Sequence, residues 1–278
     1  MNLGEIEQHW KNWAGEFKLD LRATTKTRTI KELEISALYR AFKKTPFFSQ
    51  KGCEVLEVGC GNGHNCFSLS NLIPNFIFTG VDFIPEMVLS ANEIKNSNPN
   101  YNTTKFFEGN ILKLYENTNL EDKYHIIFTN RCLINLNTQE LQTKALDQLH
   151  DKTADGGYIV LVENIEQSYS KQNQLRESVG LKKRTPDKFN LFINEPEFLA
   201  YAKQKLNLLH VESFASLHDI VLYVLVPMIT DGNVDYEHPI VAAVTKLLLA
   251  NPEEVGNSFG DFGQNRLYVF KKEACDEK

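Results

Sequence analysis

The sequence predicts an α/β fold whose core is a doubly wound, mostly parallel sheet. Two observations predict it. Short runs rich in β-branched and aromatic residues alternate with segments of helical periodicity from about residue 51 to residue 170. These runs have the character of strands buried on both faces, as occurs when helices cover a parallel sheet.

Seven strands are expected, six of them before residue 215 and one close to the C-terminus. They are expected at residues 54–58, 76–82, 103–107, 124–129, 158–163, 208–214 and 266–271. Helices are expected at residues 65–72, 85–95, 138–150 and from 194 to about 207. Pro85 suits a first helical turn, and Asn137 or Thr138 suits the cap of a helix N-terminus.

The remaining residues are expected to cover this core and not to form a second domain. Residues 1–50 contain an amphipathic helix at about 30–43, which predicts an N-terminal helical cap. Residues 215–264 have helical character at 219–228 and 239–250, which indicates a helical insertion before the last strand. We therefore expect residues 1–278 to form one domain, with its core at 51–214 and the last strand and tail at 265–278.

Composition and charge argue against several classes of protein. The chain has 42% apolar and 24% charged residues, which excludes wholesale disorder. A net charge of −6 argues against nucleic acid as a partner. The longest apolar run, at 220–229, contains Pro227 and is far shorter than the roughly 20 residues that cross a membrane.

The cysteines and the first residues indicate a cytoplasmic protein without a structural metal. Five cysteines, at positions 53, 60, 66, 132 and 275, form neither a CxxC pair nor a zinc-like spacing. We expect them to be small buried apolar side chains. The N-terminus has acidic residues and no apolar stretch, so we expect no signal peptide.

A glycine-rich loop follows the first strand and opens the next helix. It reads Glu57-Val58-Gly59-Cys60-Gly61-Asn62-Gly63. Glycines let the backbone turn sharply and approach a ligand closely, and free N–H groups at the helix start favour a polar or anionic group. Asp82 ends the second strand, where a carboxylate can accept both hydroxyls of a ribose.

Two other interpretations of this loop stay open. A dinucleotide-binding loop has the spacing GxGxxG, but position 64 is His64 and the third glycine comes one residue early, at Gly63. A nicotinamide-dependent oxidoreductase is therefore a rival hypothesis. The other interpretation is a tight turn in which the glycines serve packing alone.

The motif E-V-G-C-G-N-G after a strand, with Asp82 ending the next strand, resembles the class I S-adenosylmethionine-dependent methyltransferases. The resemblance covers about residues 51–163. It implies a Rossmann-like sheet whose last strand is antiparallel, with S-adenosylmethionine as the cofactor. In that family the glycine loop approaches the methionine part of the cofactor, the carboxylate binds the ribose, and a residue at the position of Met87 commonly packs on the adenine. The cofactor-binding residues implied are Glu57, Gly59, Cys60, Gly61, Gly63, Asp82, Phe83, Met87, Gly109, Asn110, Ile111, Asn130 and Arg131.

The chain departs from the family pattern at two places. Asn110 stands where an aspartate often accepts from the adenine amino group, although an amide oxygen can accept the same bond. The sequence after the fourth strand, Asn130-Arg131-Cys132-Leu133, lacks the two prolines of nucleic-acid amino methyltransferases, which argues against base methylation. Arg131 has two interpretations: a clamp for an anionic substrate or the cofactor carboxylate, and an internal ion pair at the sheet edge.

The candidates for a general base are His218 and then Glu163. Glu163 ends the fifth strand, and His218 begins the insertion. Asp219 follows His218, but adjacent residues on a helix point apart, so we do not expect them to pair directly. For any one histidine, a surface or satisfied core role is the commoner alternative.

Two polar stretches have alternative interpretations. Residues 1–50 carry an aromatic and polar group that forms either a lid over the cofactor or a helix on the sheet flank: Trp10, Trp13, Arg22, Thr24, Thr25 and Lys26. Lys182-Lys183-Arg184 is either a solvated turn or an electrostatic seat for a phosphorylated substrate.

The sequence therefore predicts methyl transfer to a small molecule, since covers over the site would exclude a duplex or a folded protein. By family analogy the favoured acceptor is a hydroxyl oxygen of a sugar or sugar-nucleotide type metabolite. The alternatives are N-methylation, methylation of a phosphate- or carboxylate-bearing small molecule, a nicotinamide-dependent oxidoreductase, and a non-catalytic cofactor-binding protein. A small-molecule substrate is the expected partner, a membrane is not expected, and a homodimer is left open.

Overall fold

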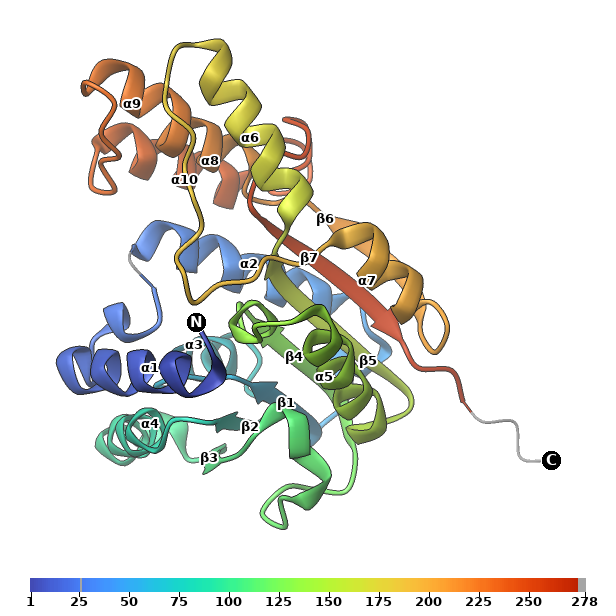
Figure 1. Cartoon of the computed structure of the whole chain (residues 1–278). Coiled ribbons are helices and arrows are strands. Elements are labelled where there is room, and N and C mark those ends of the chain that lie inside the picture. Colours follow the sequence, from blue (N-terminus) through green and yellow to red (C-terminus); the bar gives the residue numbers. More distant parts are fainter. Residues whose placement is uncertain (26, 275–278) are drawn as a thin grey trace.

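The computed structural model describes residues 1–25 and 27–274, and within them one seven-stranded sheet lies between two layers of helices (Figure 1). The strand order is β3-β2-β1-β4-β5-β7-β6, with β7 antiparallel to both of its neighbours and the other pairs parallel. The strands are β1 Cys53–Val58, β2 Phe76–Asp82, β3 Thr104–Glu108, β4 Tyr124–Asn130, β5 Thr153–Asn164, β6 Asn207–Glu212 and β7 Asn265–Lys271. The predicted fold class is confirmed.

The strand order reverses between β1 and β4. The chain runs outward from β1 through β2 to β3 and then returns to the other side of β1 with β4. The loops that follow β1 and β4 therefore leave the same edge of the sheet in opposite directions, and open α/β sheets bind their ligands in the crevice at such a point. The glycine loop follows β1 directly.

Helices cover both faces of the sheet. One apolar core lies beneath α2 Arg28–Lys43, α3 His64–Leu72 and α4 Pro85–Ser97. The other core lies beneath α5 Gln139–Lys152 and α7 Glu195–Ala202.

Two element boundaries differ from the sequence-based expectation by about five residues, and those of the other strands and core helices by at most two. β5 begins at Thr153 and not at Tyr158, because a register shift opposite β4 accommodates Gly156 and Gly157 within the strand. α7 ends at Ala202, about five residues early, because the chain turns there and the Leu206 amide donates back to the Ala202 carbonyl. Both differences arise from local turns.

Apart from the two layers on the faces of the sheet, a further group of helices stands above the carboxyl edge of the sheet at one end of the molecule (Figure 1). It consists of α6 Glu166–Ser178, the segment 179–194, α8 Ser216–Ile220, a π-helical turn Val221–Leu225, α9 Val226–Ile229 and α10 Pro239–Ala250. We call these elements the C-terminal cap. The helix α6 was not predicted from the sequence.

The single helix expected at 219–228 is three segments, and Pro227 explains the break. Proline has no N–H to donate to the carbonyl four residues earlier, that of Tyr223. That carbonyl instead accepts a hydrogen bond from the Arg176 guanidinium of α6. The irregular turn therefore joins α6 to the rest of the C-terminal cap.

The N-terminal segment forms α1 Leu3–Phe17, which the sequence analysis did not predict, and the short turn η1 Leu21–Ala23 before α2. Ala14 of α1 and Ala23 pack against Ile84 and Met87 at the start of α4. The segment thereby lies along the edge of the sheet that carries the glycine loop.

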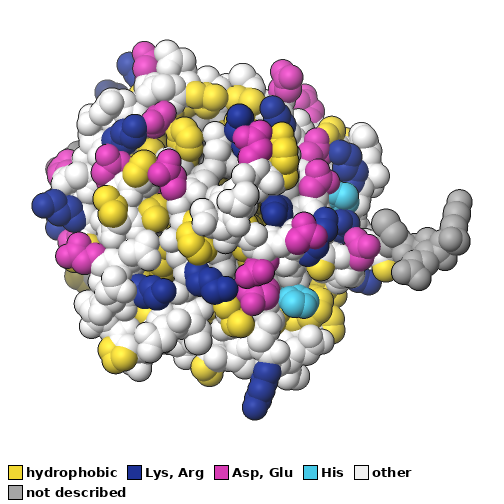
Figure 2. Space-filling model, turned by 90° about the horizontal axis from the view of Figure 1, so that it is seen from below, with side chains coloured by type: hydrophobic (Ala, Val, Ile, Leu, Met, Phe, Trp, Pro, Cys, Tyr) yellow, Lys and Arg dark blue, Asp and Glu magenta, His cyan; other side chains and the backbone are white. Residues whose placement is uncertain are grey.

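The surface in Figure 2 mixes charges of both signs, with basic and acidic side chains interspersed over the face it shows. Within the described residues, no helix has both the length and the apolar character needed to cross a membrane. Cys53, Cys60 and Cys66 are buried and Cys132 is partly buried, all as free thiols. Cys275 lies outside the described residues.

The packing of α2 on the sheet predicts a large stability effect at Phe42. Its fully buried ring lies 5.4 Å from the Phe128 ring and 6.4 Å from the Phe76 ring, centroid to centroid. Phe42→Ala is expected to lower the free energy of unfolding by about 3–5 kcal/mol in urea denaturation, because it leaves a cavity. Leu89→Ala, at a helical side chain that is 69% exposed, is the control and is expected to change it by less than about 0.5 kcal/mol. Equal effects of the two substitutions would contradict this packing.

Candidate active site

A cavity of about 840 Å³ opens at the carboxyl edge of the sheet. Its walls come from the loops after β1, β2, β3 and β4, from the N-terminal segment, from the C-terminal cap, and from the end of β5 and the start of β7. This volume lies within the range of about 300–1,000 Å³ that ligand sites occupy. The cavity therefore has the place and the size of a ligand-binding site.

The glycine loop forms one wall and leaves no room for side chains. Gly59, Gly61 and Gly63 all have positive φ, at 77°, 54° and 82°. A Cβ at Gly59 would lie 2.5 Å from the Cys132 Sγ, and one at Gly61 would overlap the methyl group of Thr24. The bare backbone of Gly59 and Gly61 therefore faces the cavity, as a close approach to a ligand requires.

Asp82 lies beside this loop and fixes its shape. Its Oδ2 accepts from the Gly61 amide at 2.7 Å, and its Oδ1 accepts from the Ile84 amide at 2.9 Å. Burial raises the pKa of this carboxyl, although these backbone hydrogen bonds oppose the effect. Each carboxylate oxygen has a second lone pair, so Asp82 can also accept from ligand hydroxyls in the cavity.

Ten of the thirteen residues that the resemblance implied for the cofactor line this cavity. They are Gly59, Gly61, Asp82, Phe83, Met87, Gly109, Asn110, Ile111, Asn130 and Arg131. The Oδ1 of Asn110 accepts from the Leu112 amide at 2.8 Å, so it caps the short turn η4 Ile111–Glu116. This leaves its second lone pair for a ligand.

The other three residues, Glu57, Cys60 and Gly63, lie behind the cavity wall. Gly63 is the N-cap of α3, and a Cβ there would collide with Phe67 and Phe106. Glu57 accepts from the Asn65 amide nitrogen at 2.6 Å and from the Cys66 thiol at 3.1 Å. Burial raises the pKa of Glu57 to about 7. These residues therefore hold the loop on α3 from behind.

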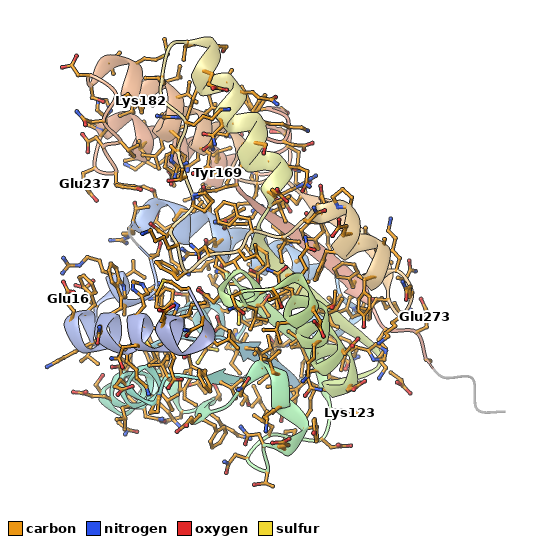
Figure 3. The ribbon with its side chains drawn as sticks, in the orientation of Figure 1. Glu16, Lys123, Tyr169, Lys182, Glu237 and Glu273 are labelled. Atoms are coloured by element: carbon orange, nitrogen blue, oxygen red, sulfur yellow. The ribbon has the colours of Figure 1, made fainter. Side chains whose placement is uncertain are left out.

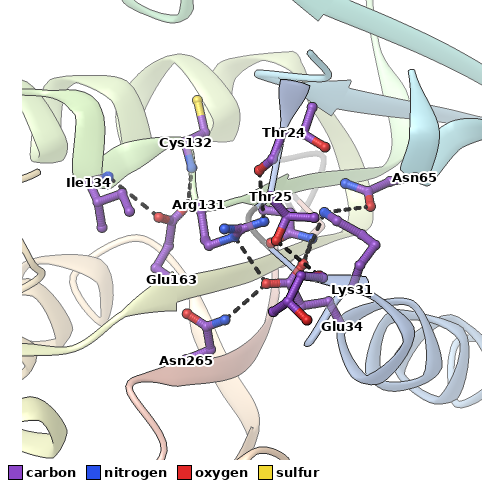
Figure 4. Close-up of polar contacts among 12 residues, drawn as sticks. Thr24, Thr25, Lys31, Glu34, Asn65, Arg131, Cys132, Ile134, Glu163 and Asn265 are labelled. Carbon is purple, nitrogen blue, oxygen red and sulfur yellow. Dashed lines mark hydrogen bonds and ion pairs between the residues drawn. The ribbon is translucent and has the colours of Figure 1, made fainter. Parts of the chain in front are cut away.

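A fully buried carboxylate, that of Glu34 on α2, joins the N-terminal segment to the sheet edge (Figure 4). Its Oε2 lies 2.9 Å from the Lys31 Nζ and accepts from the Asn130 Nδ2 at 3.0 Å. Its Oε1 lies 3.0 Å from the Arg131 Nε and accepts from the Asn265 Nδ2 at 2.9 Å. Burial alone would raise the pKa of Glu34, but Arg131 and Lys31 hold it below its usual value.

Arg131 forms the internal ion pair that was one of its two interpretations. It has a φ of +56°, unusual for a residue with a side chain, and its Nη2 donates to the Thr24 carbonyl at 3.0 Å. Because Arg131 also lines the cavity, it connects Glu34, the N-terminal segment and the ligand site.

Other contacts hold the N-terminal segment over the cavity. The Asn62 Nδ2 of the glycine loop donates to the Asp20 carbonyl at 2.9 Å, and the Trp10 Nε1 donates to Asn135 at 3.1 Å. The His9 ring stacks on Phe189 of the C-terminal cap with centroids 4.1 Å apart. Trp10, Trp13, Arg22, Thr24 and Thr25 line the cavity, while Lys26 lies outside the described residues.

His218 and Glu163, the candidate bases, do not line the cavity and are each 1% exposed. The His218 Nε2 lies 3.1 Å from the Thr29 hydroxyl of α2, and its Nδ1 lies 2.9 Å from Asp219. The expectation that His218 and Asp219 do not pair was wrong, because the aspartate side chain reaches back to the ring beside it.

Glu163 lies beneath the loop that follows β4. It accepts from the Thr129 hydroxyl at 2.7 Å and from the amides of Cys132 and Leu133 at 3.1 and 3.2 Å. Burial raises the pKa of Glu163 to about 7, although these hydrogen bonds oppose the effect. Its contacts hold the start of the turn η5 Leu133–Asn135, which forms part of the cavity wall.

Several residues of this site were not predicted from the sequence. Lys31 and Glu34 are charged residues on the face of α2 that packs on the core, and that placement among apolar neighbours was the available signal. No comparable sequence signal marks the further cavity-lining residues that come from distant elements: His9, Asn164, Tyr169, Tyr223, Tyr236 and Asn265. Within the part of the chain that the structure describes, no cluster of three or more His, Cys, Asp or Glu side chains could hold a metal ion.

Comparisons with known proteins agree with this geometry. A family model described as a methyltransferase domain matches residues 49–215, more than half of the chain. A malonyl-[acyl-carrier protein] O-methyltransferase of Ilyobacter polytropus is 37% identical over 82 residues. That match spans 30% of this chain and 28% of the relative, so it covers only a part of either protein.

Solved structures share the fold over nearly the whole chain. A chain of the Haloferax volcanii complex between the Trm112 methyltransferase activator and a methyltransferase matches with a TM-score of 0.60 at 14% identity, covering 96% of this chain and 98% of that chain. The N-methyltransferase NodS of Bradyrhizobium japonicum, solved with S-adenosyl-L-homocysteine, matches with a TM-score of 0.57 at 12% identity and the same coverage. The chain belongs to the class I methyltransferases, the family whose cofactor is S-adenosylmethionine.

Proposed function

We propose that this methyltransferase transfers the methyl group of S-adenosylmethionine to a hydroxyl oxygen of a small molecule. The observation that carries the proposal is one cavity with two chemically different ends. One end has the bare glycine backbone and Asp82, and the other lies under the C-terminal cap, with aromatic and polar walls. Because the N-terminal segment and the C-terminal cap meet through His9 and Phe189, the space suits a small acceptor better than a macromolecule.

The cavity residues fit the cofactor part by part. The backbone of Gly59 and Gly61 would receive its methionine portion, and Asp82 its ribose hydroxyls. Met87 and Ile111 would flank the adenine, and Asn110 would accept from the adenine amino group. The Arg131 Nε is paired with the Glu34 carboxylate, so we assign Arg131 the role of stabilising the cavity wall.

When bound, S-adenosylmethionine supplies an electrophilic methyl group for an in-line displacement. The protein's part is to align the acceptor atom with that methyl group and to exclude water. The Oδ1 atoms of Asn130 and Asn265 are buried and have no hydrogen-bond partner among residues 1–25 and 27–274. Each amide donates through its Nδ2 to Glu34, so its oxygen is left to accept from the O–H of the acceptor. An amine would satisfy the same oxygens, so N-methylation stays the alternative.

Glu163 and His218 are better suited to positioning than to proton transfer. Glu163 holds the loop after β4, and His218 joins the C-terminal cap to α2. The histidine that belongs to the cavity wall, among the described residues, is His9.

A sugar-type acceptor, a cytoplasmic location, a homodimer and the single-domain division with caps at 1–50 and 215–264 stay predictions from the sequence. A nicotinamide oxidoreductase or a non-catalytic protein is not favoured, given the family.

The ribose assignment predicts the effect of Asp82→Ala on cofactor binding. Loss of hydrogen bonds from a carboxylate to two hydroxyls is expected to cost about 3 kcal/mol, or about a hundredfold in the dissociation constant of S-adenosylhomocysteine. Isothermal titration calorimetry measures this constant directly. Asp122→Ala, at an exposed aspartate away from the cavity, is the control and should bind as the wild type does. Unchanged affinity in a folded Asp82→Ala protein would show that the ribose assignment is wrong.

The raised pKa of Glu163 predicts a pH-dependent stability effect. Because the folded-state pKa of about 7 lies above the ordinary value of 4.5, the folded protein holds this proton more tightly than the unfolded chain. The associated stability is fully present below about pH 4.5 and is lost as the pH rises through 7. Urea denaturation at pH 5, 6 and 7.5 should therefore show the wild type losing about 2 kcal/mol relative to Glu163→Gln as the pH increases. The free energy of unfolding of Glu93→Gln, at an exposed glutamate, should differ from that of the wild type by the same amount at all three pH values. If Glu163→Gln also differed from the wild type by a constant amount, the assigned burial of Glu163 would be contradicted.

A further inference from the structure

The arginines of the chain divide into two groups by their partners. Of the seven, five pair with a carboxylate within 4.0 Å: Arg22, Arg28, Arg40, Arg131 and Arg266. The other two, Arg176 and Arg184, pair with no carboxylate in the described part of the chain, and both belong to the C-terminal cap. Arg176 and Arg184 are close enough for the charge of Arg184 to act on Arg176, so the cap brings together two guanidinium groups without a directly paired carboxylate.

Arg176 is occupied by the cap itself. Its guanidinium donates to the carbonyl oxygens of Lys182 and Tyr223, and the side chain is almost fully buried. Burial lowers the pKa of Arg176, and the nearby charge of Arg184 lowers it further. Arg176 therefore fixes the segment that carries Arg184 and is not itself available to a ligand.

Arg184 lines the cavity and is held in place from behind. Its backbone amide donates to the Asn173 Oδ1 at 2.9 Å, and its carbonyl accepts from the Asn173 Nδ2 at 3.0 Å. Its Nη1 donates to Gln172 at 2.7 Å, and its Cζ lies 3.4 Å from the centroid of the Tyr223 ring. The structure gives its Nε and Nη2 no hydrogen bond within residues 1–25 and 27–274, so this side of the fork is free to donate.

A second, independent observation lies beside it. Tyr169 of α6 is 6% exposed and lines the same cavity, yet its buried hydroxyl has no hydrogen-bond partner among the described residues. Its ring centroid lies 5.3 Å from the Arg184 Cζ. Figure 3 shows Tyr169 where the C-terminal cap meets the core, whereas Lys182 lies farther out on the cap. Burying a hydroxyl without a hydrogen-bond partner costs free energy, and a ligand that supplies the partner removes this cost.

We propose that Arg184 and Tyr169 form an anion-binding subsite that holds a carboxylate or phosphate group of the methyl acceptor. A guanidinium fork binds the two oxygens of such a group, and the phenol O–H supplies a further donor. The rings of Tyr223 and Tyr236 close the subsite from the side of the cap. Asp187 also lines the cavity, and its charge acts on Tyr169. This inference rests on the proposed function, since the subsite and the glycine loop belong to one cavity.

The first experiment measures binding without a known substrate. The complex with S-adenosylhomocysteine is heated with benzoate, with phenyl phosphate and with the neutral benzamide, and the melting temperature is followed against concentration. Benzoate or phenyl phosphate should stabilise the complex and benzamide should not, and the more effective of the two anions distinguishes a carboxylate from a phosphate. Stabilisation by neither anion, or equal stabilisation by benzamide, overturns the proposal.

Variants assign the effect to Arg184. Arg184→Gln should abolish the anion-dependent shift, Arg184→Lys should retain part of it, and Tyr169→Phe should weaken it. Lys182→Gln is the matched control, because it removes one positive charge from the same segment outside the cavity wall, and it should behave as the wild type does. An unchanged anion-dependent shift in Arg184→Gln overturns the proposal.

Turnover supplies a second readout. Small hydroxyl compounds are assayed in matched pairs, hydroxy acids against their amides and sugar phosphates against free sugars, by release of S-adenosylhomocysteine. The anionic member should have at least a tenfold higher kcat/KM, and Arg184→Gln should remove that preference while leaving the affinity for S-adenosylhomocysteine within twofold. A preference for the neutral members overturns the anion subsite. Failure of the wild type to bind S-adenosylhomocysteine would instead contradict the proposed function, so the two failures are distinguishable.

Discussion

The buried carboxylate of Glu34 is the interaction on which the candidate site depends. It lies among four partners from α2, the end of β4 and the start of β7, all within 3.0 Å. Two of the partners, Lys31 and Arg131, carry positive charge, so the fully buried carboxylate has two counter-charges beside it. Removing one member of such a cluster leaves an unpaired buried charge, which typically costs about 3–5 kcal/mol.

The geometry of the cavity follows from this cluster. Through Arg131, Glu34 holds the Thr24 carbonyl and with it the N-terminal segment that walls one side. The same carboxylate orients the amides of Asn130 and Asn265, whose oxygens are left without a partner at the sheet edge. The positive φ of Arg131 is a strained conformation for such a residue, and these contacts offset its cost. The Glu34 side chain thus positions both the N-terminal segment over the cavity and the asparagine amides at the sheet edge.

The strands and the glycine loop were predictable from the sequence because each depends on residues close together in the chain. The β2 strand was predicted to the residue, and the glycine loop with Asp82 lines the end of the cavity that we assign to the cofactor. The Glu34 cluster was not predictable, because Asn130 and Asn265 reach it from 96 and 231 residues away. The roles of Glu163 and His218 were unpredictable for the same reason, since their partners come from separate elements that only the folded chain brings together.

Hydrogen exchange on Glu34→Gln tests the central claim most directly, because it reports how firmly each backbone segment is held. If Glu34 holds the cavity together, amides in residues 18–25 and 131–136 should exchange at least tenfold faster in Glu34→Gln than in the wild type, while those of β2 and α5 should not change. Glu32→Gln, which removes a partly exposed carboxylate paired with Arg28 on the same helix, should leave the exchange of these segments unchanged. Unchanged exchange at residues 18–25 and 131–136 in Glu34→Gln would contradict the account.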